Sequence, residues 1–174
     1  MALRQILTEP NKILRQKSLP VTKVDTELQR LMDDMLETMY AAPGIGLAAI
    51  QVGIPKRVIV IDIARKEEPK NPMFFINPEI INKSKNNSSY EEGCLSVPGQ
   101  FAEIDRPDKC HLKYLNYYGE AKEIKAEGML ATCIQHEMDH LEGILFIDYL
   151  SKLKKTMIIK KLSKQKKQLE RIVV

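Results

Sequence analysis

Apolar residues first recur at helical spacing in the segment after Asp25. Because they follow an i, i+3, i+4, i+7 rhythm, they form one stripe on a helix. These residues are Leu28, Leu31, Met32, Met35, Leu36 and Met39. Asp25 has a side chain suited to capping a helix N-terminus, and Pro43 cannot continue a helix. The pattern predicts an amphipathic helix from Asp25 to about Ala41, with its methionines packed in the core.

The middle of the chain has the short β-branched and aromatic runs that are typical of strands. Residues 57–63 and 74–81 are two such runs, and residues 111–125 form a predicted hairpin that turns at Tyr118-Gly119. Residues 44–49 are small and predict a loop. Pro98 is expected to end any regular strand around it, because it lacks an N–H.

Two further helices are predicted in the last third of the chain. One runs from about Met129 to Gly143, which suits the position just after a helix C-terminus. The other runs from about Ser151 to the end and places a set of apolar residues roughly on one side: Leu153, Met157, Ile158, Leu162 and Leu169. The fold class is therefore α+β, with mixed or antiparallel β-sheets packed around the Met129–Gly143 helix.

At 174 residues the chain is long enough for one well-buried domain and short for two. The prediction is a single domain over residues 1–150, extended by a basic helix over residues 151–174. No apolar run approaches the ~20 residues that span a bilayer, and the N-terminus lacks the pattern of a secretory signal. Three cysteines without framework spacing indicate reduced thiols, as in a cytoplasm.

The positive charge is concentrated at the C-terminal end. Residues 151–174 carry eight lysines, Arg171 and only Glu170 as an acid, a net of +8. Because the whole chain is at +4, the other residues sum to −4. The plain interpretation is a solvated helix face, and the more specific one is a contact with a phosphate backbone. A membrane-surface role is disfavoured, because the helix lacks aromatic anchors.

The strongest chemical signal is the run His136-Glu137-Met138-Asp139-His140, an H-E-x-x-H pattern. On a helix, His136, His140 and Glu137 point at about 0°, 40° and 100°, so they share one side. Two imidazoles can then hold one metal ion with a carboxylate beside it. A metallopeptidase that cleaves internal bonds is one interpretation. However, Phe146 stands where the common zinc proteases place a third histidine.

Spacing alone leaves the third ligand open among His111, the three cysteines and the acidic residues. Cys133 lies seven residues from His140, about 10 Å along a helix axis, so one ion is not expected to touch both. Cys110 and His111 sit in an alternating strand pattern that favours structural roles. Cys94 lies in a Gly-Cys-Leu-Ser segment and is as well explained by burial as by metal binding.

Three segments together resemble the signature motifs of peptide deformylases. Gly44–Gln51 resembles G-x-G-L-A-A-x-Q, Glu92–Ser96 resembles E-G-C-L-S, and Gln135–Leu141 resembles Q-H-E-x-D-H-L. They occur in the family's order, and the likeness extends over about residues 3–150. H-E-x-x-H alone is a weak signal, whereas the three motifs in order are specific. The resemblance implies a metal-dependent enzyme of that family.

The resemblance implies Cys94, His136 and His140 as ligands of one divalent metal ion per chain. It points to iron(II) as the native ion, with zinc, nickel or cobalt as alternatives in purified protein. The implied reaction removes the formyl group from N-formylmethionyl nascent chains and releases formate. In that reaction a metal-activated water attacks the formyl carbon, and Glu137 serves as general base and then general acid. Gln51 and the Leu95 backbone N–H are the implied oxyanion donors.

The matched motifs and their neighbours also imply walls for a methionine pocket. These are Ile45, Gly46, Glu92, Tyr90, Met129, Thr132, Cys133 and His136. One departure is Phe101, where many bacterial relatives have an arginine, which leaves open how the peptide beyond methionine is held. Arg106 is expected to pair with Glu92 and brace the cysteine loop.

The partners that follow are formylmethionyl peptides and, through the basic helix, ribosomal RNA of the ribosome. The expected setting is the bacterial cytoplasm, with an organellar protein whose leader is missing from the sequence as the alternative. A monomer without membrane contact is expected. The competing hypothesis is a protein without enzymatic activity: a non-catalytic, ribosome-associated deformylase-like protein with a structural metal.

Overall fold

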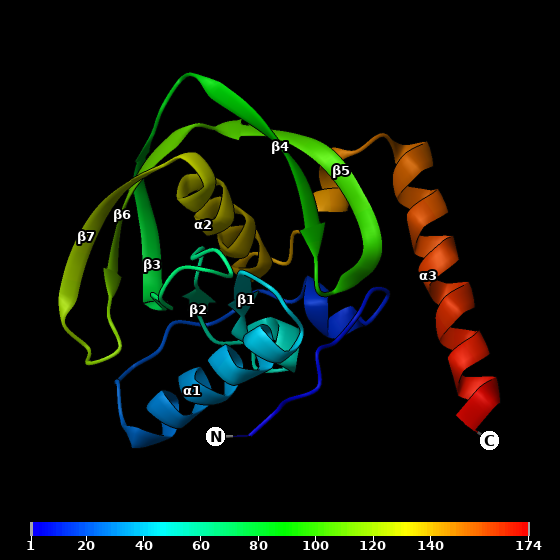
Figure 1. The fold of residues 1–174 in the computed structure, drawn as a ribbon, viewed down its shortest axis with the longest axis horizontal. Coiled ribbons are helices and arrows are strands. Elements are labelled where there is room, and N and C mark those ends of the chain that lie inside the picture. The colour runs from blue at the N-terminus through cyan, green and yellow to red at the C-terminus, as the bar shows by residue number, and fades with distance from the viewer. Residues whose placement is uncertain (1, 174) are drawn as a thin grey trace.

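The computed structural model describes residues 2–173 and contains two antiparallel sheets and three α-helices (Figure 1). The α-helices are α1 (Thr26–Ala41), α2 (Gly128–Leu141) and α3 (Lys152–Val173). The strands are β1 (Gly46–Ala48), β2 (Val58–Ile61), β3 (Met73–Lys83), β4 (Asn87–Cys94), β5 (Val97–Pro107), β6 (Lys109–Leu115) and β7 (Ala121–Glu127). Short 3-10 helices are η1 (Lys12–Arg15), η2 (Ala49–Val52) and η3 (Phe146–Tyr149). The predicted α+β class is confirmed.

The larger sheet has the strand order β1-β2-β3-β6-β7, and β4 pairs with β5 in a separate ribbon. Every pairing between these strands is antiparallel. Figure 1 shows α2 enclosed between the β3-β6-β7 part of the sheet and the β4-β5 ribbon. Helix α1 packs below against β1 and β2, and α3 stands beside β5 at the edge of the molecule. The H-E-x-x-H helix is therefore central.

Strand β2 separates two hydrophobic clusters. Its four residues are β-branched and all buried. Because successive side chains of a strand point to opposite faces, Val58 and Val60 join the cluster around α1, while Ile59 and Ile61 join the cluster around α2. A strand covered on both faces reads as a continuous apolar run, which is why the sequence identifies it readily.

The predicted ends of two helices are confirmed in detail. The Asp25 side chain accepts a hydrogen bond from Leu28 N at 2.9 Å and caps α1. After α2, Gly143 has a φ of 75°, its N–H donates to His140 O, and Ile144 N–H donates to Asp139 O. This pair of bonds is the Schellman arrangement that ends a helix. A Cβ on Gly143 would also come within 2.4 Å of the Arg15 carbonyl oxygen.

The expectation that Pro98 ends a strand is wrong, because Pro98 is the second residue of β5. Neither strand of the β4-β5 ribbon was predicted from the sequence, and the residues of β1 were predicted to form a loop. The ribbon pairs only with itself. A proline near the start of such a strand is tolerated, because the missing N–H need not serve a second neighbour.

The apolar side predicted for the last helix is only partly right. Leu162 is 4% exposed and, with Ile158 and Ile159, packs against β5 and η3, whereas Leu153 is 71% exposed and Leu169 64%. Met157, at 61%, is also exposed. Helical spacing aligns Leu162 with Leu169, but it does not show how far the supporting surface extends. No helix among residues 2–173 is long and apolar enough to cross a membrane.

Candidate metal centre

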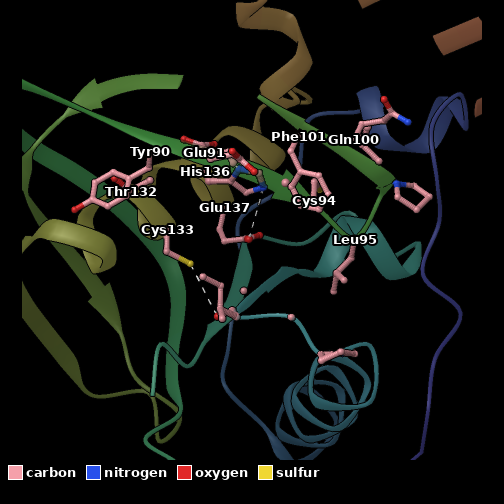
Figure 2. A pocket seen from close by; sticks show the side chains of 18 of the residues that line it. Tyr90, Glu91, Cys94, Leu95, Gln100, Phe101, Thr132, Cys133, His136 and Glu137 are labelled. Carbon is pink, nitrogen blue, oxygen red and sulfur yellow. Dashed lines mark hydrogen bonds and ion pairs between the residues drawn. The ribbon is translucent and has the colours of Figure 1, made fainter. Parts of the chain in front are cut away.

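Helix α2 presents His136 and His140 towards Cys94, the last residue of β4. One possible ligand atom from each of these three residues lies within 4.8 Å of the others, and Cys94 Sγ is 3.4 Å from His140 Nε2. In the close view, Cys94, His136 and Glu137 converge from the ribbon and the helix (Figure 2). A thiolate with two imidazoles suits zinc, iron, nickel or cobalt, whereas magnesium and calcium prefer oxygen ligands.

The ring of His136 is fixed from behind by Glu92 on β4. His136 Nδ1 lies 2.8 Å from Glu92 Oε1, and because a carboxylate can only accept, Nδ1 carries the hydrogen and Nε2 is left for a metal. Burial alone would raise the pKa of Glu92, but hydrogen bonds from His136 and Arg106 lower it below its usual value. Glu92 is therefore an anion at neutral pH.

Arg106 on β5 compensates the buried charge of Glu92. Its Nε donates to Glu92 Oε2 at 2.6 Å, one terminal nitrogen donates to Glu92 Oε1 at 3.0 Å, and the other donates to Asp139 Oδ2 at 2.8 Å. The predicted Glu92–Arg106 pair is confirmed. Arg106 is 5% exposed, so the pair lies where an unpartnered charge would be strongly destabilising.

Two buried polar atoms at the centre, His140 Nδ1 and Glu137 Oε2, have no hydrogen-bond partner among residues 2–173. Burial lowers the pKa of His140 well below its usual value, so its imidazole is neutral, the form that binds metals. A buried polar atom left unsatisfied is costly, and such atoms mark places where a ligand is expected. The donor set and the unpartnered Glu137 oxygen beside it both fit a metal ion.

Glu137 follows His136 on α2, and both residues line one cavity. It is 3% exposed, and burial raises its pKa to about 7. A carboxyl group with that pKa can take up and release a proton near neutral pH. Gly46 of β1 allows the backbone to lie against it, since a Cβ there would be 2.5 Å from Glu137 Oε1 and 3.0 Å from Cys133 Sγ.

Gln51 in η2 lies beside the Cys94 thiol and is buried. Its Oε1 accepts from Ala48 N at 2.9 Å, while Nε2 donates to Ser96 Oγ at 3.0 Å and lies 3.5 Å from Cys94 Sγ. The side chain is thus held at both ends, next to the possible ligands. Leu95, the other predicted donor residue, packs over Gly44, where a Cβ would be 2.7 Å from its Cδ1.

A cavity of about 460 Å³ opens next to Glu137 and His136 (Figure 2). All the predicted pocket residues line it: Ile45, Gly46, Tyr90, Glu92, Met129, Thr132, Cys133 and His136. A second group of lining residues was not predicted from the sequence: Pro43, Gly44, Val97, Pro98, Gly99 and Gln100. Most of these lie at the start of β5. They were missed because no sequence pattern predicted the β4-β5 ribbon that places them at the cavity. Leu95 and Phe101 also line the cavity, whereas Gln51 does not.

The family model described as polypeptide deformylase matches residues 3–156. The chain belongs to the polypeptide deformylase family.

Related proteins of this family cover the whole length of the chain. The peptide deformylase of Pelagibacter ubique is 67% identical over 100% of both chains, and that of Phenylobacterium zucineum is 62% identical over 96% of this chain and 99% of its own. A solved peptide deformylase from Ehrlichia chaffeensis in complex with actinonin has a TM-score of 0.91 at 45% identity, covering 95% of this chain and 98% of that one. A Legionella pneumophila peptide deformylase has a TM-score of 0.90 at 44% identity, covering 98% and 99%.

Membership of the deformylase family makes this chain a metal-dependent hydrolase. It also removes the reason to favour a metallopeptidase, because the deformylase family model matches residues 3–156.

Proposed function

We propose that this deformylase removes the formyl group from N-formylmethionyl nascent polypeptides and releases formate. The observation that carries the proposal is the convergence of Cys94, His136 and His140 with an unpartnered glutamate oxygen at the wall of a cavity. The Ehrlichia chaffeensis relative was solved with actinonin bound, which shows that a structure of this fold accepts a ligand.

Cys94, His136 and His140 would hold one divalent ion, with iron(II) as the proposed native ion and zinc, nickel or cobalt as alternatives. When bound, the ion supplies Lewis-acid chemistry, because it polarises the formyl oxygen and makes water a nucleophile near neutral pH. Glu92 keeps the His136 ring oriented for this task through its 2.8 Å contact with Nδ1.

Glu137 is the proposed general base and acid. It takes one proton from the attacking water while the new carbon–oxygen bond forms, and it gives that proton to the amine nitrogen while the carbon–nitrogen bond breaks. A pKa of about 7 suits both steps, because neither protonation state is far from neutral pH. The products are formate and a free amino terminus.

Gln51 and the Leu95 backbone N–H are the proposed donors to the developing oxyanion. A glutamine amide carries two hydrogens, and Nε2 donates one of them to Ser96 Oγ. Nε2 also donates to Cys94 Sγ, 3.5 Å away, so the amide lies beside a residue that would hold the ion. Donors held in place before the reaction are effective because they need no reorganisation when charge develops.

The cavity is the proposed site of the methionine side chain. Its walls combine small and flexible residues, among them Gly46, Met129 and Cys133, that suit an unbranched thioether. Phe101 is 65% exposed at this cavity, and its ring lies over Gly93, where a Cβ would come within 2.5 Å of it. We assign Phe101 to contact with the peptide beyond methionine.

The direct test is formate release from a short formyl-Met peptide by protein loaded with iron(II) in the absence of oxygen. An acetyl-Met peptide serves as the substrate control, and Gln51→Ala as the site control. Release should require both the formyl group and the ion, and Gln51→Ala should lose about 10²–10³-fold in turnover. Folded, metal-loaded protein without formate release would reject the deformylase proposal and favour a non-catalytic ribosome-associated module.

The proposed setting is the bacterial cytoplasm, and the proposed docking element is α3. Its lysines at positions 160, 164 and 167, on either side of the buried Leu162 in the sequence, are exposed. Exposed lysines that neutralise phosphates make binding depend on salt. Truncation after Leu150 would also remove the buried Leu162, so charge substitution is the cleaner test.

The experiment compares Lys160, Lys164 and Lys167 changed to Gln with a control in which the exposed lysines 113, 122 and 125 of the sheet are changed to Gln. Only the α3 variant should bind ribosomes more weakly, with a salt dependence reduced by up to about 0.7–0.9 in log–log slope per lost contact. Both variants should keep their activity on short peptides. Equal ribosome affinity of the two variants would reject docking through α3.

A further inference from the structure

A continuous row of polar contacts leads from His136 to Tyr149 at the surface. His136 contacts Glu92, Glu92 pairs with Arg106, and Arg106 donates to Asp139 Oδ2 at 2.8 Å. The Tyr149 hydroxyl donates to the same Asp139 oxygen at 2.7 Å. The row joins β4, β5, α2 and η3, so no single element fixes it.

Tyr149 contacts the row in two ways. Its hydroxyl binds Asp139, and its ring lies under the Arg106 guanidinium, whose central carbon is 5.1 Å from the ring centre. Burial and the hydrogen bond to Asp139 raise the pKa of Tyr149 to about 12, so the hydroxyl keeps its proton and remains a donor. A tyrosine at this place therefore restrains both Asp139 and Arg106.

Tyr149 can influence the orientation of His136 because one oxygen of Glu92 contacts both His136 and Arg106. Glu92 Oε1 accepts from His136 Nδ1 at 2.8 Å and from Arg106 at 3.0 Å. Any movement of Arg106 therefore moves the acceptor that orients the imidazole. Arg106, Glu92 and His136 are each at most 9% exposed, so water is poorly placed to substitute for a displaced contact.

The geometry points to Tyr149 as a positioning residue for the metal ligand His136, acting through Asp139, Arg106 and Glu92. This inference rests on the proposed function, since it requires an ion held by Cys94, His136 and His140. Tyr149 lies outside the three signature-like segments, and no pattern in the sequence distinguishes it. The partners that orient ligating histidines typically change metal affinity by about 10–100-fold when removed. Because Tyr149 lies further along the row, the expected effect is smaller, about threefold to tenfold.

The test uses the full chain loaded with cobalt(II), whose visible absorption reports ligand geometry. Tyr149→Phe removes only the hydroxyl, and Tyr118→Phe, at a tyrosine 74% exposed in the β6-β7 turn, is the matched control. Release of cobalt to a chelator should be about threefold to tenfold faster in Tyr149→Phe, and its absorption bands should shift. The control should match the wild type, and the metal-free proteins should unfold at the same temperature.

A double-mutant cycle tests whether Tyr149 acts on His136 through Asp139. In an Asp139→Asn background, Tyr149→Phe should add little to cobalt release, because the path through Asp139 is already altered. A full additional effect in that background would contradict the route. Cobalt release and absorption identical to the wild type in Tyr149→Phe would overturn the inference alone. Failure of the wild-type protein to bind cobalt would overturn the proposed metal site together with it.

Discussion

Helices α2 and α3 were both predicted from the sequence, yet their surroundings are opposite. Nine of the 14 residues of α2 are buried, including the polar or charged Gln135, His136, Glu137 and His140. In α3, Leu162 is the buried residue among the side chains that the structure describes. Polar groups inside a protein must be matched by particular partners, whereas polar groups on a projecting helix are matched by water. The polar residues of the two helices are therefore under very different constraints.

The sharpest contrast is expected from one substitution made on each helix. Glu137→Gln on α2 keeps the size of the side chain but removes the proton acceptor, so turnover should fall about 10²–10⁴-fold. Glu170→Gln on the exposed part of α3 should leave turnover unchanged. Formate release and metal content measure both variants. Near-normal turnover of Glu137→Gln with metal bound would contradict the proposed mechanism.

Removing a charge that is buried beside α2 should cost far more stability than removing an exposed charge on α3. Arg106→Met leaves Glu92 buried without its main partner, so the free energy of unfolding should drop by about 3–5 kcal/mol. Lys164→Met on α3 removes an equal charge from the surface and should change stability by less than about 0.5 kcal/mol. Urea unfolding followed by circular dichroism measures both. Similar losses would show that the buried pair is less dependent on Arg106 than its contacts indicate.

Replacing single leucines by alanine tests how much of α3 packs against the rest of the protein. Leu141→Ala on α2 should cost about 2–5 kcal/mol because the side chain is fully buried. Leu162→Ala should fall at the lower end of that range, and Leu169→Ala within about 0.5 kcal/mol of the wild type. The same urea titrations provide the ranking. A large loss for Leu169→Ala would mean that α3 is covered along its whole length in solution.

The smallest effect concerns Asp148, which joins η3 to both Arg15 and Lys155. Burial alone would raise the pKa of Asp148, but these hydrogen bonds lower it below its usual value. A carboxyl whose pKa is lower in the folded state adds stability above its unfolded pKa of about 4, and that stability is lost as the pH falls towards the folded value. Asp148→Asn should therefore cost about 1 kcal/mol at pH 7.

The difference between wild type and Asp148→Asn should shrink below about pH 4, as unfolding curves over pH 3–7 can show. A difference that stays constant with pH would mean that packing, and not charge, accounts for the loss.

The comparison also explains how much the sequence could predict. Helices α1 and α2 have their own start and stop signals, such as Asp25 and Gly143, and β2 is apolar on both faces. These elements were predicted correctly because the signals are local. The β4-β5 ribbon and the exposed side of α3 were not, because each depends on how far a neighbouring surface extends. That information is not encoded in the spacing of residues along the segment.

One part of the candidate metal centre was also predictable from local sequence, and another part was not. Helix geometry alone places His136, Glu137 and His140 on one side, but Cys94 is 46 residues from His140, and spacing could not choose it over other candidates. The resemblance to the deformylase motifs made that choice, and the structure brings Cys94 to the histidines. The roles of Gln51 and of the Leu95 backbone N–H stay predictions, and Gln51→Ala tests the first of them.

The order of the three candidate ligands along the chain decides when they can meet during synthesis. A chain is synthesised from its N-terminus, so Cys94 and the β4-β5 ribbon exist before α2 has been made. Until then the glutamate and arginine that later orient His136 have no histidine to orient, and the thiol has no imidazole beside it. A metal centre built from these three residues could therefore form only after α2 has been synthesised. We expect metal uptake to follow completion of the chain and not to guide its early folding.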